Sequence, residues 1–115
     1  MKKNLRFDRL FRFASDKLND RLIALLGKED VPYAVDEGRY VYYRSDNEEA
    51  FEDVLARIRN AVFPEWQILS SPRTWTERYR AEMDKRGVNY QEEWTDGSVD
   101  FLISQEHKPH AWKMG

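Results

Sequence analysis

The sequence predicts an α+β fold: a ferredoxin-like two-layer sandwich with a mainly antiparallel sheet and with its helices on one face. Two observations lead to this prediction. One pattern of residues occurs twice, about half a chain apart, and each copy reads strand, helix, strand, strand. A strongly amphipathic stretch separates the copies. The first six elements therefore have the order strand-helix-strand-strand-helix-strand of ferredoxin-like folds, in which helices pack against a sheet.

The two copies carry similar residue types at matching positions. The segment 31–35 (VPYAV) returns as 88–92 (VNYQE), and 20–22 (DRL) aligns with 77–79 (ERY). We expect a single compact domain whose second half repeats the first. Its parts are the domain 1–104, the pseudo-repeats 5–45 and 65–104, the joining helix 47–63 and the C-terminal tail 105–115.

The first unit shows its elements through local signals. A strand over 5–13 precedes a helix whose first turn Ser15 can cap with its side-chain oxygen. Leucines at helical spacing give that helix one apolar stripe. Pro32 cannot donate a ladder hydrogen bond, so we expect the strand 31–35 at an edge or outer position of the sheet. A glycine-containing turn joins it to the strand 39–44 as a hairpin.

The connecting helix and the second unit follow in the same way. The helix over 47–63 has the clearest apolar stripe in the chain, formed by Phe51, Val54, Leu55, Ile58 and Val62. A strand over 65–70 comes next, and a second helix begins near Pro72, which is favourable in a first helical turn. Gly87 closes that helix. The pair Asp96-Gly97 then indicates a hairpin.

Composition excludes several classes of function. The chain of 115 residues has no cysteine, so disulfides, thiol catalysis and cysteine metal sites are excluded. No apolar run approaches the ~18 residues that span a bilayer, and no apolar core of a signal peptide follows the basic start. The formal net charge of -2 gives no overall attraction to nucleic acid or to an anionic membrane. We therefore expect a soluble, cytoplasmic protein.

Part of the first half resembles a known family. The matching stretches are 9–11 leading into a helix, 22–32 with its leucines and Asp30-Val31-Pro32, 40–42, and the helix start 46–50. Residues 9–58 are similar in these features to the small bacterial "signal-transducing" domain family. The resemblance implies a ferredoxin-like domain and no catalytic residues, because the family supplies no secure catalytic set. The proline–tryptophan insertion often seen in that family's hairpin is absent here, where 36–38 (DEG) stands.

The aromatic residues of the predicted strands are the main candidate for function. Tyr40 and Tyr42 share one strand face, with Arg39 and Arg44 on either side. Aromatic and arginine side chains are enriched in protein interfaces. The predicted binding surface comprises Arg39, Tyr40, Tyr42, Tyr43, Arg44 and Trp94. Its expected partner is another protein or a second copy. The alternative of a nucleic-acid-binding sheet is disfavoured, because the glycine–phenylalanine signature of such modules is missing.

No arrangement of residues in the sequence favours catalysis or a cofactor. The two histidines, His107 and His110, are weak candidates for metal ligands, because Lys108 and Pro109 lie between them in a polar tail. A catalytic histidine would need a nucleophile and an orienting carboxylate, which the spacing does not supply. The sequence therefore predicts a non-catalytic binding or regulatory module, expected to be homodimeric and to need no cofactor. The alternative is a small-molecule sensor with a cleft between the repeats.

Overall fold

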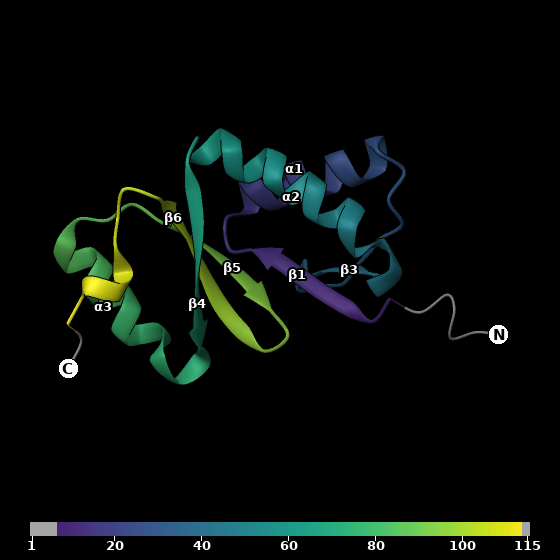
Figure 1. Cartoon of the computed structure of the whole chain (residues 1–115). Helices are drawn as coiled ribbons and strands as arrows, with labels where there is room; N and C mark the ends of the chain where they lie inside the picture. Colours follow the sequence, from purple (N-terminus) through teal and green to yellow (C-terminus); the bar gives the residue numbers. More distant parts are fainter. Residues whose placement is uncertain (1–6, 114–115) are drawn as a thin grey trace.

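A computed structural model of the chain describes residues 7–113 and contains one antiparallel six-stranded sheet with three helices (Figure 1). The strands are β1 (Arg9–Phe13), β2 (Ala34–Val35), β3 (Val41–Tyr43), β4 (Trp66–Pro72), β5 (Gln91–Thr95) and β6 (Ser98–Ser104). The helices are α1 (Asp16–Lys28), α2 (Glu48–Val62) and α3 (Thr76–Arg86). The strand order is β2-β3-β1-β5-β6-β4. This is an α+β protein, as predicted. Within the described residues, no helix is both long and apolar enough to cross a membrane.

Local chemistry predicts the start of α1 and the end of α3, but the prediction that the third helix begins near Pro72 is wrong. Pro72 is the last residue of β4, and α3 begins at Thr76 after the short 3-10 turn Arg73–Trp75. The Ser15 side chain accepts a hydrogen bond from the backbone N–H of Leu18 and caps α1, which satisfies a free amide of the first turn. Gly87 ends α3 with a φ of 71°, a left-handed conformation that glycine adopts without a Cβ clash. β2 lies at one edge of the sheet, as expected, but it covers only Ala34–Val35, so Pro32 lies outside the strand predicted over 31–35.

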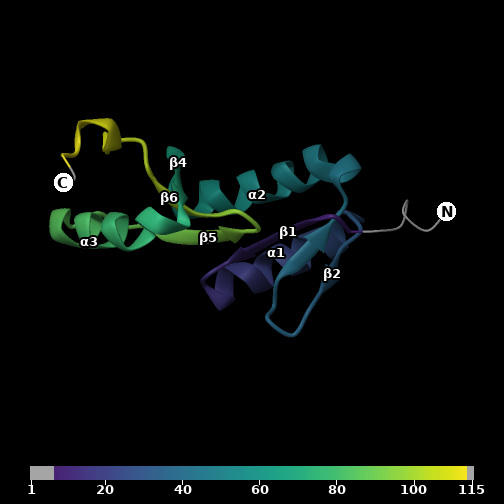
Figure 2. The same ribbon diagram turned by 90° about the horizontal axis from the view of Figure 1, so that it is seen from below.

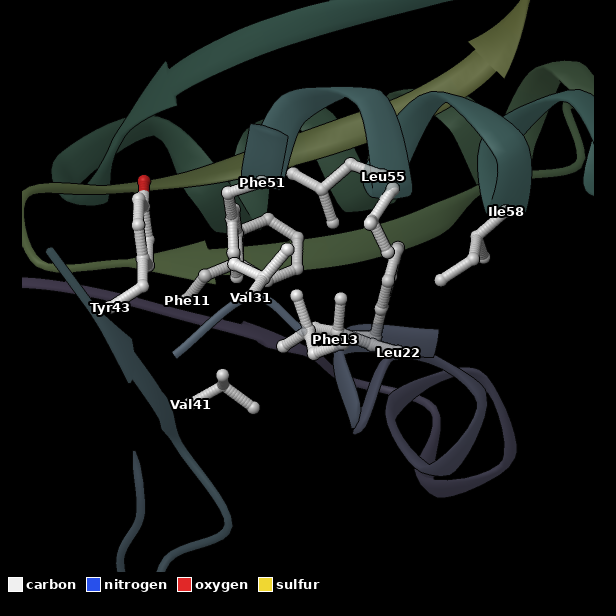
Figure 3. Close-up of a cluster of buried hydrophobic side chains, with 11 residues drawn as sticks. Phe11, Phe13, Leu22, Val31, Val41, Tyr43, Phe51, Leu55 and Ile58 are labelled. Atoms are coloured by element: carbon white, nitrogen blue, oxygen red, sulfur yellow. The ribbon is translucent and has the colours of Figure 1, made fainter. Parts of the chain in front are cut away.

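The first hydrophobic core lies between α1, α2 and one face of the sheet (Figure 3). The side chains of Phe11 and Phe13 point from β1 toward Phe51 of α2 and are almost fully buried. The Tyr43 ring stacks on Phe51 with ring centroids 3.7 Å apart. Burial of such large rings contributes much of the stability of a domain this small. The core also contains Leu22, Leu26, Val31, Val41, Val54, Leu55 and Ile58.

The second hydrophobic core lies under α3, on the opposite face of the sheet. It comprises Met83, Val88, Phe101 and Ile103, with Leu69, Tyr79, Tyr90, Val99 and Trp112 packed around it. The strand register gives the face. Phe13 of the first core pairs with Glu93, whereas Phe101 of the second core pairs with Glu92. Neighbouring residues of a strand point to opposite faces. The predicted placement of all helices on one face is therefore wrong.

The direction of the two units explains why α3 changes face. Both units have their first strand paired with the third and the third with the second, all antiparallel. In each unit a helix thus connects two parallel strands, and such crossovers are almost always right-handed. β1 and β5 join the units and pair antiparallel, so the strands of the second unit run opposite to the corresponding strands of the first. A right-handed crossover in a reversed unit must lie on the other face.

The two cores lie side by side along an elongated molecule. Figures 1 and 2 show α3 at one end and α1 with α2 at the other. The dimensions are 49 × 28 × 23 Å and the radius of gyration is 15.2 Å. A compact domain of this length has a radius of gyration of about 13 Å.

β4, which follows α2 in sequence, lies at the far edge of the sheet, while β5 lies beside β1. The finer ferredoxin-like description is therefore not confirmed.

Candidate functional site

Among residues 7–113, no helix packs on one half of one sheet face. α1 and α2 cover the face that carries Phe11 and Phe13, and the second core places α3 over β6 and β4. The opposite face of β1 carries Leu10, paired with Tyr42, and Arg12, paired with Trp94. These side chains are half-buried. We call the set Leu10, Arg12, Tyr40, Tyr42 and Trp94 the aromatic surface.

Contacts among its side chains hold the aromatic surface in one arrangement. The Arg12 guanidinium lies over the Trp94 ring, 5.4 Å from its centroid, a cation–π geometry. The rings of Tyr40 and Trp94 are 6.4 Å apart and tilted by 37°. Arg12 also donates to Asp16 over 2.7 Å and to the carbonyl of Gly38. Since these rotamers are already ordered, binding costs less side-chain entropy.

Tyr42 is held by a hydrogen bond of its own. Its hydroxyl donates to the Asp36 carboxylate over 2.9 Å, and the other oxygen of that carboxylate accepts from the backbone N–H of Tyr40 over 3.0 Å. The bond to Asp36 raises the pKa of the Tyr42 hydroxyl. The phenol is therefore protonated at neutral pH and offers an apolar ring with a polar tip.

Cations around the aromatic surface are paired with carboxylates. Arg39 contacts Asp16 and Asp20, both from α1. Arg44 makes a two-pronged contact with Asp46, with nitrogen–oxygen distances of 3.1 and 2.6 Å. Beyond Trp94, Glu92 accepts from Arg80 of α3 over 2.6 and 2.8 Å. Because the Arg80 hydrogen bonds favour the charged carboxylate, they lower the pKa of Glu92.

The structure divides the binding residues that the sequence predicted. Tyr43 is buried in the first core, 7% exposed, so its inclusion in the surface is wrong. Neighbouring residues of a strand point to opposite faces, so Tyr43 and Tyr42 cannot lie on the same surface even though both are tyrosines. Sequence reasoning missed Leu10 and Arg12. The same alternation in β1, with Phe11 and Phe13 inward, places them on the outward face.

A second candidate site is a cleft of about 550 Å³ on the α2 face, where the two units meet. We call it the ionic cleft. One wall comes from β1 and β3 of the first unit, and another from the hairpin between β5 and β6. Its charged lining residues are Asp8, Arg9, Glu52, Arg59, Glu93, Asp96 and Asp100. Sequence reasoning anticipated a cleft between the units only as an alternative, and assigned none of these residues to it.

A buried ion pair lies in the ionic cleft. Arg59 donates through Nε and Nη2 to both oxygens of Glu93, over 2.9 and 2.7 Å. The residues are 7% and 1% exposed. Burial raises the pKa of the Glu93 carboxyl, and the hydrogen bonds from Arg59 oppose that shift. Glu52 adds a longer contact of 3.4 Å to Arg59 Nη1. The Arg59 guanidinium also lies over the Trp66 ring, 5.0 Å from its centroid.

The two C-terminal histidines have few possible metal ligands near them. His107 lies 3.6 Å from its neighbour Glu106, an exposed carboxylate, and His110 is exposed. Across residues 7–113, no three side chains of histidine, aspartate or glutamate gather in a way that could hold a metal ion. The carbonyl of His107 instead accepts from the Gln67 side chain over 2.9 Å, which ties the tail to β4.

Comparison with known proteins returned no family model, no curated protein and no solved structure that matches the chain. The resemblance to the signal-transducing domain family is neither confirmed nor refuted, and it stays a prediction.

Proposed function

We propose that the protein is a non-catalytic binding module that acts through protein–protein contact at the aromatic surface, as a homodimer. The observation that carries this proposal is the uncovered half-sheet on which Arg12, Tyr40, Tyr42 and Trp94 are already ordered. Tyrosine, tryptophan and arginine dominate the energetics of protein interfaces, because they bury much area at little entropic cost. A rim of compensated ion pairs matches the polar rim of such interfaces.

The charges favour a protein partner over a nucleic acid. A surface that binds phosphates needs cations that are free to neutralise them. Arg12, Arg39 and Arg44 each contact a carboxylate of this chain. Binding to phosphates would have to break these pairs at a cost in free energy. A nucleic-acid-binding sheet is therefore the less favoured reading of the same aromatic residues.

The proposal also covers the evolutionary origin of the two units, the cellular location and the absence of catalysis. We infer that the two units are copies of one unit, since they share element order and strand pairing. A cytoplasmic location, expected from the sequence, also stays a proposal.

The absence of catalysis belongs to the proposal too. It is supported by the state of Glu93, the most buried carboxylate of the ionic cleft, both of whose oxygens accept from Arg59.

Substitution of Tyr42 by alanine tests the proposed surface. Tyr42→Ala removes a ring from its centre, whereas Trp75→Ala removes an exposed ring from outside it and serves as the control. Proteins captured from a lysate by the wild-type chain should be retained by Trp75→Ala and lost by Tyr42→Ala, with circular dichroism unchanged. Equal capture by both variants would contradict the proposal, and so would a wild-type chain that captures nothing and stays monomeric.

A small-molecule sensor is the second candidate, and the ionic cleft is the observation that favours it. The cleft joins residues of both units, and its carboxylates outnumber its guanidinium groups. It would therefore suit a small organic cation. A thermal-shift screen of amines distinguishes this candidate, because a ligand that binds the folded state raises the melting temperature. A shift that Asp100→Asn abolishes would support it, and no shift with any amine would refute it.

A further inference from the structure

β4 is an edge strand with little of the usual protection against pairing, since its one protective residue is Pro72 at the end of the strand. It has seven residues, pairs with β6 on one side and is last in the strand order. Its segment 66–72 (WQILSSP) contains no charged residue. Natural edge strands are commonly kept short or carry charges or bulges, because free backbone groups recruit another strand. The opposite edge follows that rule, since β2 has two residues.

The strand pairing shows which backbone groups of β4 face outward. Gln105 donates its backbone N–H to the carbonyl of Glu65 over 2.8 Å, as the ladder continues past the strand ends. The odd-numbered residues of β4 therefore form the backbone hydrogen bonds to β6. The even-numbered residues Ile68 and Ser70 direct their N–H and C=O groups to the free edge. Pro72 is also even-numbered, so the position of its missing N–H lies on the free edge too.

We propose that two copies of the chain pair their β4 strands antiparallel about a twofold axis at Leu69, which continues the sheet from one copy into the other. This proposal deepens the homodimer of the proposed function and names its interface. The contact is isologous, because each copy offers the same strand to the other. The aromatic surface is not part of it and stays free for another partner.

Charge complementarity favours this axis. Glu65 and Arg73 flank β4, each four residues from Leu69, and both are exposed. Neither has an ion-pair partner within residues 7–113, although Arg73 contacts the carbonyls of Thr95 and Asp96 over 3.3 and 3.4 Å. An axis at Leu69 sets Glu65 of each copy opposite Arg73 of the other, so the dimer contains two such pairs. An axis one residue earlier would set Glu65 opposite a serine.

The backbone groups also match in this register. Ile68 lies opposite Ser70 of the second copy, and these pairs exchange their outward N–H and C=O groups. Trp66 lies opposite Pro72 of the second copy, which has no N–H to donate. The Trp66 carbonyl does not lack a donor, since it accepts from Gln105 Nε2 over 2.9 Å. The interface therefore gains about six backbone hydrogen bonds, and the Trp66 carbonyl keeps its donor within its own chain.

A proline substitution tests the contact without disturbing the chain's own sheet. Ser70→Pro removes an outward N–H and adds a ring in the path of the second copy, while the backbone bonds between β4 and β6 use other residues. Within the chain's own sheet it removes one side-chain hydrogen bond, from Ser70 to Asp100 of β6. Sedimentation velocity from low micromolar to near-millimolar concentration should show a wild-type dimer and a Ser70→Pro monomer. Circular dichroism and urea unfolding establish that the variant is folded.

A charge swap tests the register. Glu65→Arg and Arg73→Glu each place like charges opposite one another, twice per dimer, and should each raise the dissociation constant about tenfold. The double variant Glu65→Arg/Arg73→Glu restores opposite charges and should return the constant to near the wild-type value. Glu37→Arg, an exposed site in the turn between β2 and β3, makes the same change away from the interface and should have no effect.

The outcomes separate this inference from the proposed function. A wild-type monomer at all concentrations overturns the inference, as does a folded Ser70→Pro variant that still dimerises. A double charge swap that binds more weakly than the single variants also overturns it. If Tyr42→Ala abolishes the dimer while Ser70→Pro keeps it, the copies meet at the aromatic surface. The inference then fails and the proposed function stands.

Discussion

Removal of the Glu93 charge should destabilise the protein strongly, because it leaves the Arg59 guanidinium buried without its main partner. Both residues are almost fully buried, and Glu93 accepts two hydrogen bonds from Arg59. Loss of one member of a buried ion pair costs 3–5 kcal/mol. Glu52 remains 3.4 Å from Arg59 with a half-exposed side chain, and it can compensate in part. We therefore expect Glu93→Gln to lower the free energy of unfolding by about 3 kcal/mol.

Two other variants show whether desolvation is the cause. Glu52→Gln removes a partly exposed carboxylate from the same guanidinium and should cost less than about 1 kcal/mol. The double variant Arg59→Met/Glu93→Leu replaces the buried pair by apolar side chains of similar size. It should be close to the wild-type protein in stability, because buried ion pairs contribute little once their desolvation is counted.

Urea unfolding followed by tryptophan fluorescence and circular dichroism measures these differences. The chain has four tryptophans, and one of them, Trp66, lies against Arg59, so the fluorescence reports on the unfolding of the sheet that holds the ion pair. With a slope of about 2 kcal/mol per molar urea, a loss of about 3 kcal/mol lowers the midpoint by about 1.5 M. A loss below about 1 kcal/mol for Glu93→Gln, or a double variant less stable than this single one, would refute the reasoning.

Two further predictions concern stability. Because Arg80 lowers the folded-state pKa of Glu92, this carboxylate stabilises the protein above its ordinary pKa of 4.5, and that contribution is lost as the pH falls through the folded-state value. Urea midpoints at neutral and acid pH should therefore differ less in Glu92→Gln than in the wild-type protein, and an unchanged difference would contradict the shift. Tyr43→Ala removes the ring stacked on Phe51 and should cost about 3–4 kcal/mol, whereas Tyr42→Ala should cost about 1 kcal/mol. Equal urea midpoints for these two variants would show that Tyr43 is not a core residue.

Much of the candidate site could have been read from strand alternation. Phe11 and Phe13 point into the first core, so Leu10 and Arg12 must point the other way. The same rule assigns Tyr42 and Tyr43 to opposite faces. The contact of Arg12 with Trp94 could not be read in this way, because it needs β1 and β5 as neighbours, and the residues are far apart in sequence.

Local signals in the sequence suffice for four features: the cap at Ser15, the stripe of α2, the end of α3 at Gly87 and the order of elements in each unit. These features depend on side chains within a few residues of one another, so their causes lie within one stretch of chain. Three other features become evident only in the folded chain: β5 pairs with β1, α3 lies on the opposite face, and Arg59 meets Glu93. Each depends on segments brought together by burial of apolar surface, which periodicity within a segment does not encode.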